Sequence, residues 1–413
     1  MITSRRIKEQ TQEVIDGLQR RGIKNAEELI EKVIDLDDTS KKYKNTLDDL
    51  LRQIKLKTGI IERKLKNNED VSLIKNEVLD IKNDAADLKY RLVAIEEELV
   101  HLLYDIPNVP NVNIPDGTSS AGNKVVFQTD IPSIEHKVPH YEIVKQLDII
   151  DFELGTKLTG AGFPVYKNFG ARLQRALINF FLDEAREHGF KEYGLPIVCN
   201  DASFYGTGQM PDKEKQMYKV EDGFHLIPTA EVPLTNLYRD MILEEEDMPI
   251  KLTGYTPCFR REAGSWGRNV RGLNRLHQFD KIEIVEIVRP EDSYAVLEKM
   301  REYVEGLVQK LELPYRVLCL CAGDLGFNSA FTYDIEVYSL GQDMWLEASS
   351  ISNFEDYQAN RLKLRYKTKD GEKKLAHTLN GSALALPRIM AALIEKNYDG
   401  VAVKVPKVLE KYF

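Results

Sequence analysis

The chain has 413 residues, 43% of them hydrophobic, which is enough for two or three domains with a sizeable core. No apolar run approaches the roughly 20 residues that a membrane span needs, and the first residues lack the apolar segment of a secretory signal. The formal net charge of -9 argues against a general nucleic-acid binder, although a local basic surface is compatible with it.

A continuous heptad pattern predicts two long helices over residues 26–104. In the second helix, apolar residues recur in alternating steps of four and three: Ile74, Val78, Ile81, Ala85, Leu88, Leu92, Ile95, Leu99 and Leu102. The first helix has a matching series with polar Ser40 and Lys57 in two positions: Leu36, Tyr43, Leu47, Leu50, Ile54, Ile61 and Leu65.

The polar segment 66–70 between these helices is so short that the two helices must run antiparallel. At 1.5 Å per residue, about 35 residues per helix make a rod of roughly 50 Å. A two-helix rod buries only one seam, so we expect a projecting coiled-coil arm over residues 1–105. The proline-rich segment 106–120 is predicted to be a linker, and residues 121–413 a second domain.

The charge of the predicted arm is uneven. Residues 41–66 hold nine basic and three acidic side chains, whereas residues 71–100 hold four basic and seven acidic ones. Charge alone favours an ordinary solvated surface, and the alternative is a basic stripe that contacts phosphates. The candidate residues for such a stripe are Lys41, Lys42, Lys44, Arg52, Lys55 and Lys57.

The second domain mixes strands and helices without a regular βαβ alternation. Strands are predicted at 124–128, 196–200, 282–288 and 333–340, and amphipathic helices at 170–189 and 290–311. This mixture favours an α+β fold, with a largely antiparallel sheet and flanking helices. Cys319 and Cys321 read as apolar residues of a buried strand rather than half of a metal site, and so few cysteines suit a reducing, cytoplasmic location.

The clearest candidate for phosphate binding is the arginine-rich stretch 257–288. The chain has no Walker A loop and no dinucleotide fingerprint. Arginine forks bind phosphate oxygens bidentately, and Gly264, Gly267 and Gly272 permit a tight loop. A basic surface loop is the alternative interpretation.

Three further clusters are weak when taken alone. Thr229 and Glu231 flank Ala230, and by alternation would share one face of an extended segment that could hold an ammonium group. Glu347 and Ser350 offer the oxygen ligands that Mg²⁺ takes beside phosphates. Arg388 follows Pro387 at the start of a helix, where the dipole disfavours a cation, so it suits an anionic ligand.

Together these motifs resemble those of class II aminoacyl-tRNA synthetases, and specifically the bacterial-type seryl-tRNA synthetase family. TAE, FRREAG followed by RGLNRLHQFDKIE, and HTLNGSALALPR occur in the family's order behind the arm, so the likeness covers nearly the whole chain. It implies a class II synthetase fold and a cytoplasmic homodimer joined through the helix at 170–196. The implied substrates are L-serine, ATP and tRNA(Ser), with Mg²⁺ as metal; charging of tRNA(Sec) stays open.

The resemblance also implies a role for each motif residue. Arg260 would bind the α-phosphate, Glu262 the adenine amino group and Arg275 the γ-phosphate, while Phe279 and Arg388 enclose the adenine. The implied serine site comprises Thr229, Ala230, Glu231, Arg260, Glu283 and Ser382. Glu347 and Ser350 would hold Mg²⁺ beside ATP, and the catalytic set is Arg260, Glu262 and Arg388.

Two other functions fit the same scaffold. A related ligase that loads an amino acid onto a carrier protein is expected to lack the long arm. A non-catalytic paralogue is expected to lack Arg260, Glu262 or Arg388, and all three are present. One departure from the family is Pro387, where glycine is usual, and it leaves Arg388 in place.

Overall fold

The computed structural model describes residues 1–213, 215–262 and 271–413, in two compact units. The arm unit comprises residues 2–19 and 23–107. The sheet unit comprises residues 1, 20–22 and 108–413.

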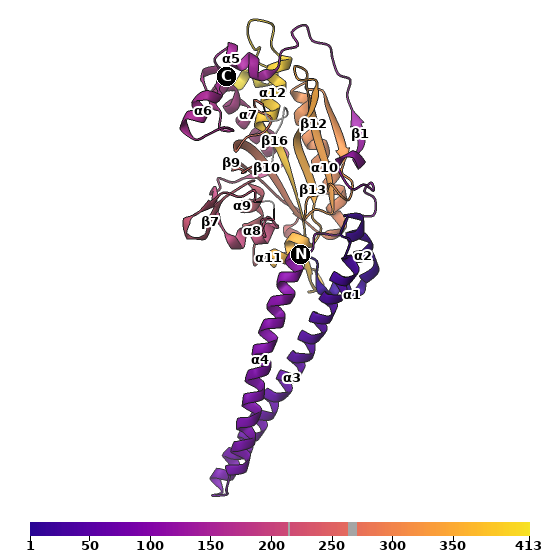
Figure 1. The fold of residues 1–413 in the computed structure, drawn as a ribbon, viewed down its shortest axis with the longest axis vertical. Helices are drawn as coiled ribbons and strands as arrows, with labels where there is room; N and C mark the ends of the chain where they lie inside the picture. Colours follow the sequence, from indigo (N-terminus) through magenta and orange to yellow (C-terminus); the bar gives the residue numbers. More distant parts are fainter. Residues whose placement is uncertain (214, 263–270) are drawn as a thin grey trace. The chain divides into compact units, whose positions relative to one another are not determined.

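The arm unit is helical: α1 (Ser4–Glu9), α2 (Thr11–Arg20), α3 (Ala26–Lys66) and α4 (Ser72–Asp105). The long helices α3 and α4 pair side by side (Figure 1), as the heptads predict. All nine predicted seam residues of α4 are buried or half-buried. On α3 the final assignment is wrong, because Leu65 is 50% exposed. The neighbouring Lys64 is half-buried and pairs with Glu69 at 3.1 Å.

Helices α1 and α2 were not assigned from the sequence. Their apolar residues Ile7, Val14 and Leu18 are fully buried, and α1 packs against α3. The side chain of Thr3 caps α1 by accepting a hydrogen bond from the Arg6 amide. These helices are too short to show a clear period, so their burial depends on tertiary packing.

An eight-stranded sheet forms the centre of the sheet unit. Every neighbouring pair is antiparallel except β4–β9, so the predicted antiparallel character is confirmed. The strand order is β1 (Lys124–Gln128), β11 (Tyr315–Cys319), β12 (Phe331–Ser339), β13 (Met344–Asn353), β16 (His377–Ala385), β10 (Gln278–Val288), β9 (Ile250–Phe259) and β4 (Lys191–Glu192).

Helices pack against this sheet and share one large apolar core with it. The main ones are α5 (His140–Gln146), α7 (Asn168–Glu187), α10 (Ser293–Lys310) and α12 (Leu386–Lys396). In Figure 1, α12 lies beside β16 and α10 lies beside β12 and β13. The helices α7 and α10 match the predicted amphipathic segments. Cys319 and Cys321 are buried at the end of β11, as their interpretation as apolar residues predicts.

Smaller elements complete the sheet unit. The short helices are α6 (Phe152–Leu158), α8 (Asp201–Thr207), α9 (Glu231–Asn236) and α11 (Tyr357–Leu362). Three small sheets are formed by β2 (Ile150–Asp151) and β3 (Val165–Tyr166); by β5 (Val198–Asn200), β7 (Phe224–Leu226) and β6 (Lys219–Val220); and by β15 (Lys373–Leu375), β14 (Arg365–Lys367) and β8 (Ile242–Glu244). None of the described helices combines the length and apolarity that a membrane crossing requires.

Candidate active site

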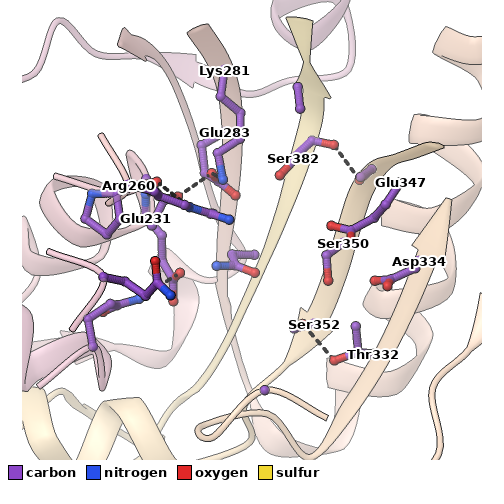
Figure 2. Close-up of a pocket in the computed structure, with 18 of the residues that line it drawn as sticks. Glu231, Arg260, Lys281, Glu283, Thr332, Asp334, Glu347, Ser350, Ser352 and Ser382 are labelled. Atoms are coloured by element: carbon purple, nitrogen blue, oxygen red, sulfur yellow. Dashed lines mark hydrogen bonds and ion pairs between the residues drawn. The ribbon is translucent and has the colours of Figure 1, made fainter. Parts of the chain in front are cut away.

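A cleft of about 750 Å³ opens over the central strands of the large sheet. Figure 2 shows Glu231, Arg260 and Glu283 toward one side, and Glu347, Ser350 and Asp334 toward the other. The cleft brings together these predicted residues: Thr229, Glu231, Arg260, Glu262, Arg275, Phe279, Glu283, Glu347, Ser350, Ser382 and Arg388. Gly264 and Gly267 lie outside the described residues, and Gly272 has the positive φ (+66°) that favours glycine.

The segment around Ala230 differs from its predicted form. Ala230 has helical dihedrals and Glu231 begins α9, so Thr229 and Glu231 do not alternate along an extended strand. Both still line the cleft, because the turn into α9 presents them together and the Glu231 amide donates to the Thr229 hydroxyl at 3.2 Å. Ala230 is fully buried beside Leu234 and lies outside the cleft lining, where its small side chain permits close packing.

Two buried carboxylates give the cleft its negative pole. Glu283 accepts a hydrogen bond from the Thr229 hydroxyl at 2.6 Å and pairs with the Lys281 ammonium group. Glu231 accepts from the amide groups of Gln358 at 2.6 Å and Gln209 at 3.2 Å. Burial, followed by the nearby charge of Glu283, raises the pKa of Glu231 to about 7. A cationic ligand would relieve both effects, so this pole suits an ammonium group.

Lys281, Gln209 and Gln358 were not assigned from the sequence. The position of Lys281 in the site could have been predicted from the sequence. It stands two residues before Glu283, and strand alternation places both on one face of β10. The two glutamines had none, since they come from a loop and a short helix that only the fold brings to Glu231.

Arg260 and Phe279 lie next to each other, where β9 and β10 pair. The Arg260 guanidinium stands 5.3 Å from the centre of the Phe279 ring, and its Nε donates to the Pro228 carbonyl at 3.4 Å. A planar cation over an aromatic ring is mutually stabilising and holds the guanidinium oriented. The remaining guanidinium donors are suited to an anionic ligand in the cleft.

Glu262 and Arg275 are paired with each other, with Arg275 donating to the Glu262 carboxylate at 2.7 Å. The Arg275 side chain is 46% exposed. Exposed pairs of this kind contribute only about 0–1 kcal/mol, so ligand groups can replace the partners at little cost.

Arg388 bridges two walls of the cleft from the first turn of α12. Its guanidinium donates to the carbonyl of Asn274 at 3.1 Å and to the carbonyl of Glu347 at 2.6 Å. The Glu347 carboxylate lies 3.7 Å away. These contacts with main-chain carbonyl groups orient the Arg388 guanidinium at the edge of the cleft.

The chemistry of the donors near Glu347 suits Mg²⁺. Asp334 of β12 lies opposite Ser350 of β13, and its Oδ1 atom is shielded from solvent without a hydrogen-bond partner among the described residues. Burial and the Glu347 charge raise the pKa of Asp334 well above its usual range. Among the described residues, no three His, Cys, Asp or Glu side chains are grouped closely enough to hold a metal ion by themselves. Two carboxylates and a hydroxyl nevertheless fit Mg²⁺, which keeps waters and takes phosphate oxygens as further ligands.

The basic residues on α3 form a separate candidate surface on the arm unit. Four of them are ion-paired with acidic neighbours of the arm: Lys41, Lys44, Arg52 and Lys57. The side chains of Lys42 and Lys55 are exposed and have no ion-pair partner in the described part of the chain. The surface can therefore offer phosphates two unpaired cations and four ion-paired ones. The pairs of Lys44 and Arg52 are exposed and therefore weak, whereas the Asp37 partner of Lys41 is buried.

Comparison with known protein families separates the same two parts of the chain. The model of the seryl-tRNA synthetase N-terminal domain matches residues 1–110, and the model of the tRNA synthetase class II core domain (G, H, P, S and T) matches residues 216–397. The serine–tRNA ligase of Akkermansia muciniphila is 45% identical over 418 residues, covering 100% of this chain and 98% of the relative. That of Salinibacter ruber is 42% identical, over 97% and 95% of the two chains.

The chain belongs to the seryl-tRNA synthetase family. It is a class II serine–tRNA ligase, so both the carrier-protein and the non-catalytic alternatives are set aside. Solved structures of the family agree with the fold. The seryl-tRNA synthetase of Pyrococcus horikoshii complexed with ATP has a TM-score of 0.92 at 30% identity, over 100% of this chain and 98% of that one. The Naegleria fowleri cytoplasmic enzyme complexed with AMP has a TM-score of 0.84 at 25% identity, over 97% and 93%.

Proposed function

We propose that the cleft activates L-serine with ATP and then passes the seryl group to the terminal ribose of tRNA(Ser). The observation that carries this proposal is the buried pair Glu231 and Glu283 beside Arg260 in one cleft. The ammonium group of an amino acid can bind the carboxylates of Glu231 and Glu283. Its carboxylate group can bind the guanidinium of Arg260.

In this proposal each polar group of serine has its own partner. The ammonium group binds Glu231 and the Thr229 hydroxyl, and the carboxylate faces Arg260. The serine hydroxyl donates to Glu283, with Ser382 close by. Buried groups arranged for a hydroxyl penalise alanine, because they are left unpaired when it binds, and threonine is excluded by its extra methyl group.

ATP lies along the arginines. Arg260 contacts the α-phosphate, Arg275 the γ-phosphate and Glu262 the adenine amino group, while Phe279 and Arg388 enclose the adenine. The serine carboxylate attacks the α-phosphorus, which forms seryl-adenylate and releases pyrophosphate. No protein nucleophile is required, so the residues act by positioning the reactants and stabilising charge.

Glu347, Ser350 and Asp334 are the residues that would hold Mg²⁺, the first two as predicted from the motif and the third from its unpaired oxygen. When bound there, Mg²⁺ neutralises phosphate charge. The protein's own contribution is to keep three oxygens together on β12 and β13, and to leave Arg388 beside Glu347 for the nucleotide.

The predicted arm, residues 1–105, is proposed to bind the phosphates of tRNA(Ser), joined by the linker 106–120 to the catalytic domain 121–413. Charging of tRNA(Sec) and a cytoplasmic location belong to the same proposal. A homodimer is proposed through α7.

The test of this function is ATP–pyrophosphate exchange with each of the twenty amino acids in turn. Serine alone should support rapid exchange, and the same preparation should charge tRNA(Ser). Equal exchange with serine and alanine would contradict the proposed hydroxyl contacts. Exchange with serine but no charging of tRNA(Ser) would contradict the second step alone.

A further inference from the structure

His140 lies at the centre of a buried hydrogen-bond network that no motif assigns. Its ring is fully buried at the start of α5. The Leu273 amide donates to its Nε2 at 2.9 Å, so Nε2 must carry a lone pair and Nδ1 the proton. Nδ1 lies 2.9 Å from Oε1 of Glu395, a fully buried residue of α12, and donates to it.

Glu395 is held by donors from two directions. Its Oε1 also accepts from the His140 amide at 2.9 Å, and its Oε2 accepts from the Ser339 hydroxyl at 2.5 Å and the Gly341 amide at 2.9 Å. A buried carboxylate needs such a full set of donors to be tolerated. The His140–Glu395 pair is thus a satisfied unit that joins α5, α12 and the turn after β12.

The backbone that leads from the arginine-rich loop into β10 rests directly on the His140 ring. Gly272 has φ +66°, and a Cβ on it would lie 2.2 Å from Nε2 of His140. Any larger residue would push this backbone off the ring and break the Leu273 hydrogen bond. Glycine is therefore required here by the close approach as well as by the backbone conformation.

From Leu273 the network continues to the cleft. The Asn274 side chain donates to Gln342 at 2.8 Å, and Gln342 donates to Ser339 at 2.8 Å. The Asn274 carbonyl accepts from Arg388 at 3.1 Å, and Arg275 is the next residue. Two of the three arginines assigned to ATP, Arg275 and Arg388, thus depend on a short segment whose anchors are His140 and Gln342.

We propose that His140, supported by Glu395, is a positioning residue for ATP binding. It presets the main chain at 272–274, and so places Arg275 and the guanidinium of Arg388 before the nucleotide arrives. The serine pocket has separate supports in α9 and the paired strands β9 and β10, so ATP affinity should depend on His140 much more than serine affinity does. This inference rests on the proposed roles of Arg275 and Arg388.

The test compares His140→Phe with His140→Gln. Phenylalanine keeps a buried ring but cannot accept from the Leu273 amide, whereas the glutamine amide oxygen can reach the place of Nε2. Loss of one buried hydrogen bond should weaken ATP binding by about tenfold in His140→Phe. Equilibrium dialysis without serine would give the Kd for ATP, and pyrophosphate exchange would give the KM for ATP and for serine. The serine KM should stay nearly unchanged, and His140→Gln should recover most of the ATP affinity.

Tyr315→Phe is the matched control, because it removes a buried hydroxyl that bonds Gln309 and Glu305 in another part of the sheet unit. It should lower the melting temperature without changing ATP affinity. Should His140→Phe fail to fold, Gln342→Leu replaces it, since Gln342 is half-buried and clamps Asn274 directly. Normal ATP affinity in a folded His140→Phe or Gln342→Leu would overturn the proposal. Absence of serine-dependent exchange in the wild type would instead overturn the proposed function.

Discussion

The arm unit and the sheet unit relate sequence to structure in different ways. In α3 and α4 every predicted seam residue except Leu65 is buried or half-buried, so a local pattern specifies most of the packing. In the sheet unit the cleft is assembled from β10, β12, β13, β16 and α9, which are far apart in the chain. The structure of a periodic region can therefore be predicted from its sequence. For the cleft, the sequence indicates the motif residues but not the side chains that contact them.

Removing the arm is the strongest test of whether the two units have separate functions. Replacing residues 30–103 by a short linker removes none of the cleft-lining residues, so serine-dependent pyrophosphate exchange should survive. Charging of tRNA(Ser) should collapse, because the phosphate-binding surface is gone. Both assays are run on one preparation whose folding is checked by thermal melting. Loss of both pyrophosphate exchange and tRNA charging in a folded variant would show that serine activation also requires the arm.

Within the sheet unit, Arg260→Ala should have the next largest effect. One preorganised charge contact in a transition state can contribute on the order of 3 kcal/mol, so exchange should fall by at least about a hundredfold. Circular dichroism should match the wild type. Exchange at the normal rate in this variant would remove Arg260 from the catalytic set.

Asp334→Asn tests whether Asp334 is a Mg²⁺ ligand, because it removes the carboxylate while keeping the shape of the side chain. Loss of a supporting carboxylate typically weakens metal binding by about 10–100-fold, so more Mg²⁺ should be needed for half-maximal exchange. Binding of Mn²⁺ with ATP, followed by electron paramagnetic resonance, gives a readout independent of activity. An unchanged metal affinity would leave Glu347 and Ser350 as the only candidate ligands.

The raised pKa of Glu231, about 7, predicts pH-dependent serine binding. Below this pH the carboxyl group binds a proton that serine's ammonium group must displace, so the serine KM should rise up to tenfold per pH unit. The same shift costs stability: relative to pH 5, folding weakens as the pH rises toward about 7, because the folded state holds the proton more tightly. Glu231→Gln should lose both pH dependences, as measured by KM profiles and urea unfolding. A serine KM that does not change between pH 6 and 8 would contradict the assignment.

The smallest effect is expected on the arm. Lys42→Glu with Lys55→Glu reverses the two unpaired cations, and each lost phosphate contact should flatten the logarithmic salt dependence of tRNA binding by roughly one unit. Filter binding at several salt concentrations measures this slope. Lys75→Glu with Lys82→Glu on α4 is the charge-matched control and should change little. If both double variants changed the salt dependence equally, tRNA binding would depend on the net charge of the arm rather than on a basic stripe along α3.

Sequence analysis could predict most of the arm because helix periodicity is local. It missed α1 and α2, which are too short to show a clear period, and it placed Leu65 in the seam although that residue is 50% exposed. In the sheet unit it predicted β1, β10 and β12 of the large sheet and the residues that meet in the cleft, but it did not assign the central strand β13. It could not predict that Ala230 is buried and directly precedes a helix. Nor could it predict that Asp334 faces Ser350, because register across β12 and β13 depends on the whole sheet.

The most direct test of the central claim is a crystal structure of the protein with a non-hydrolysable analogue of seryl-adenylate. The account predicts the ammonium group against Glu231 and Thr229, and the serine hydroxyl against Glu283. It also predicts the adenine between Phe279 and Arg388, with the phosphate mimic at Arg260. An analogue bound in the cleft without contact to Glu231 and Glu283, or bound outside the cleft, would contradict the account.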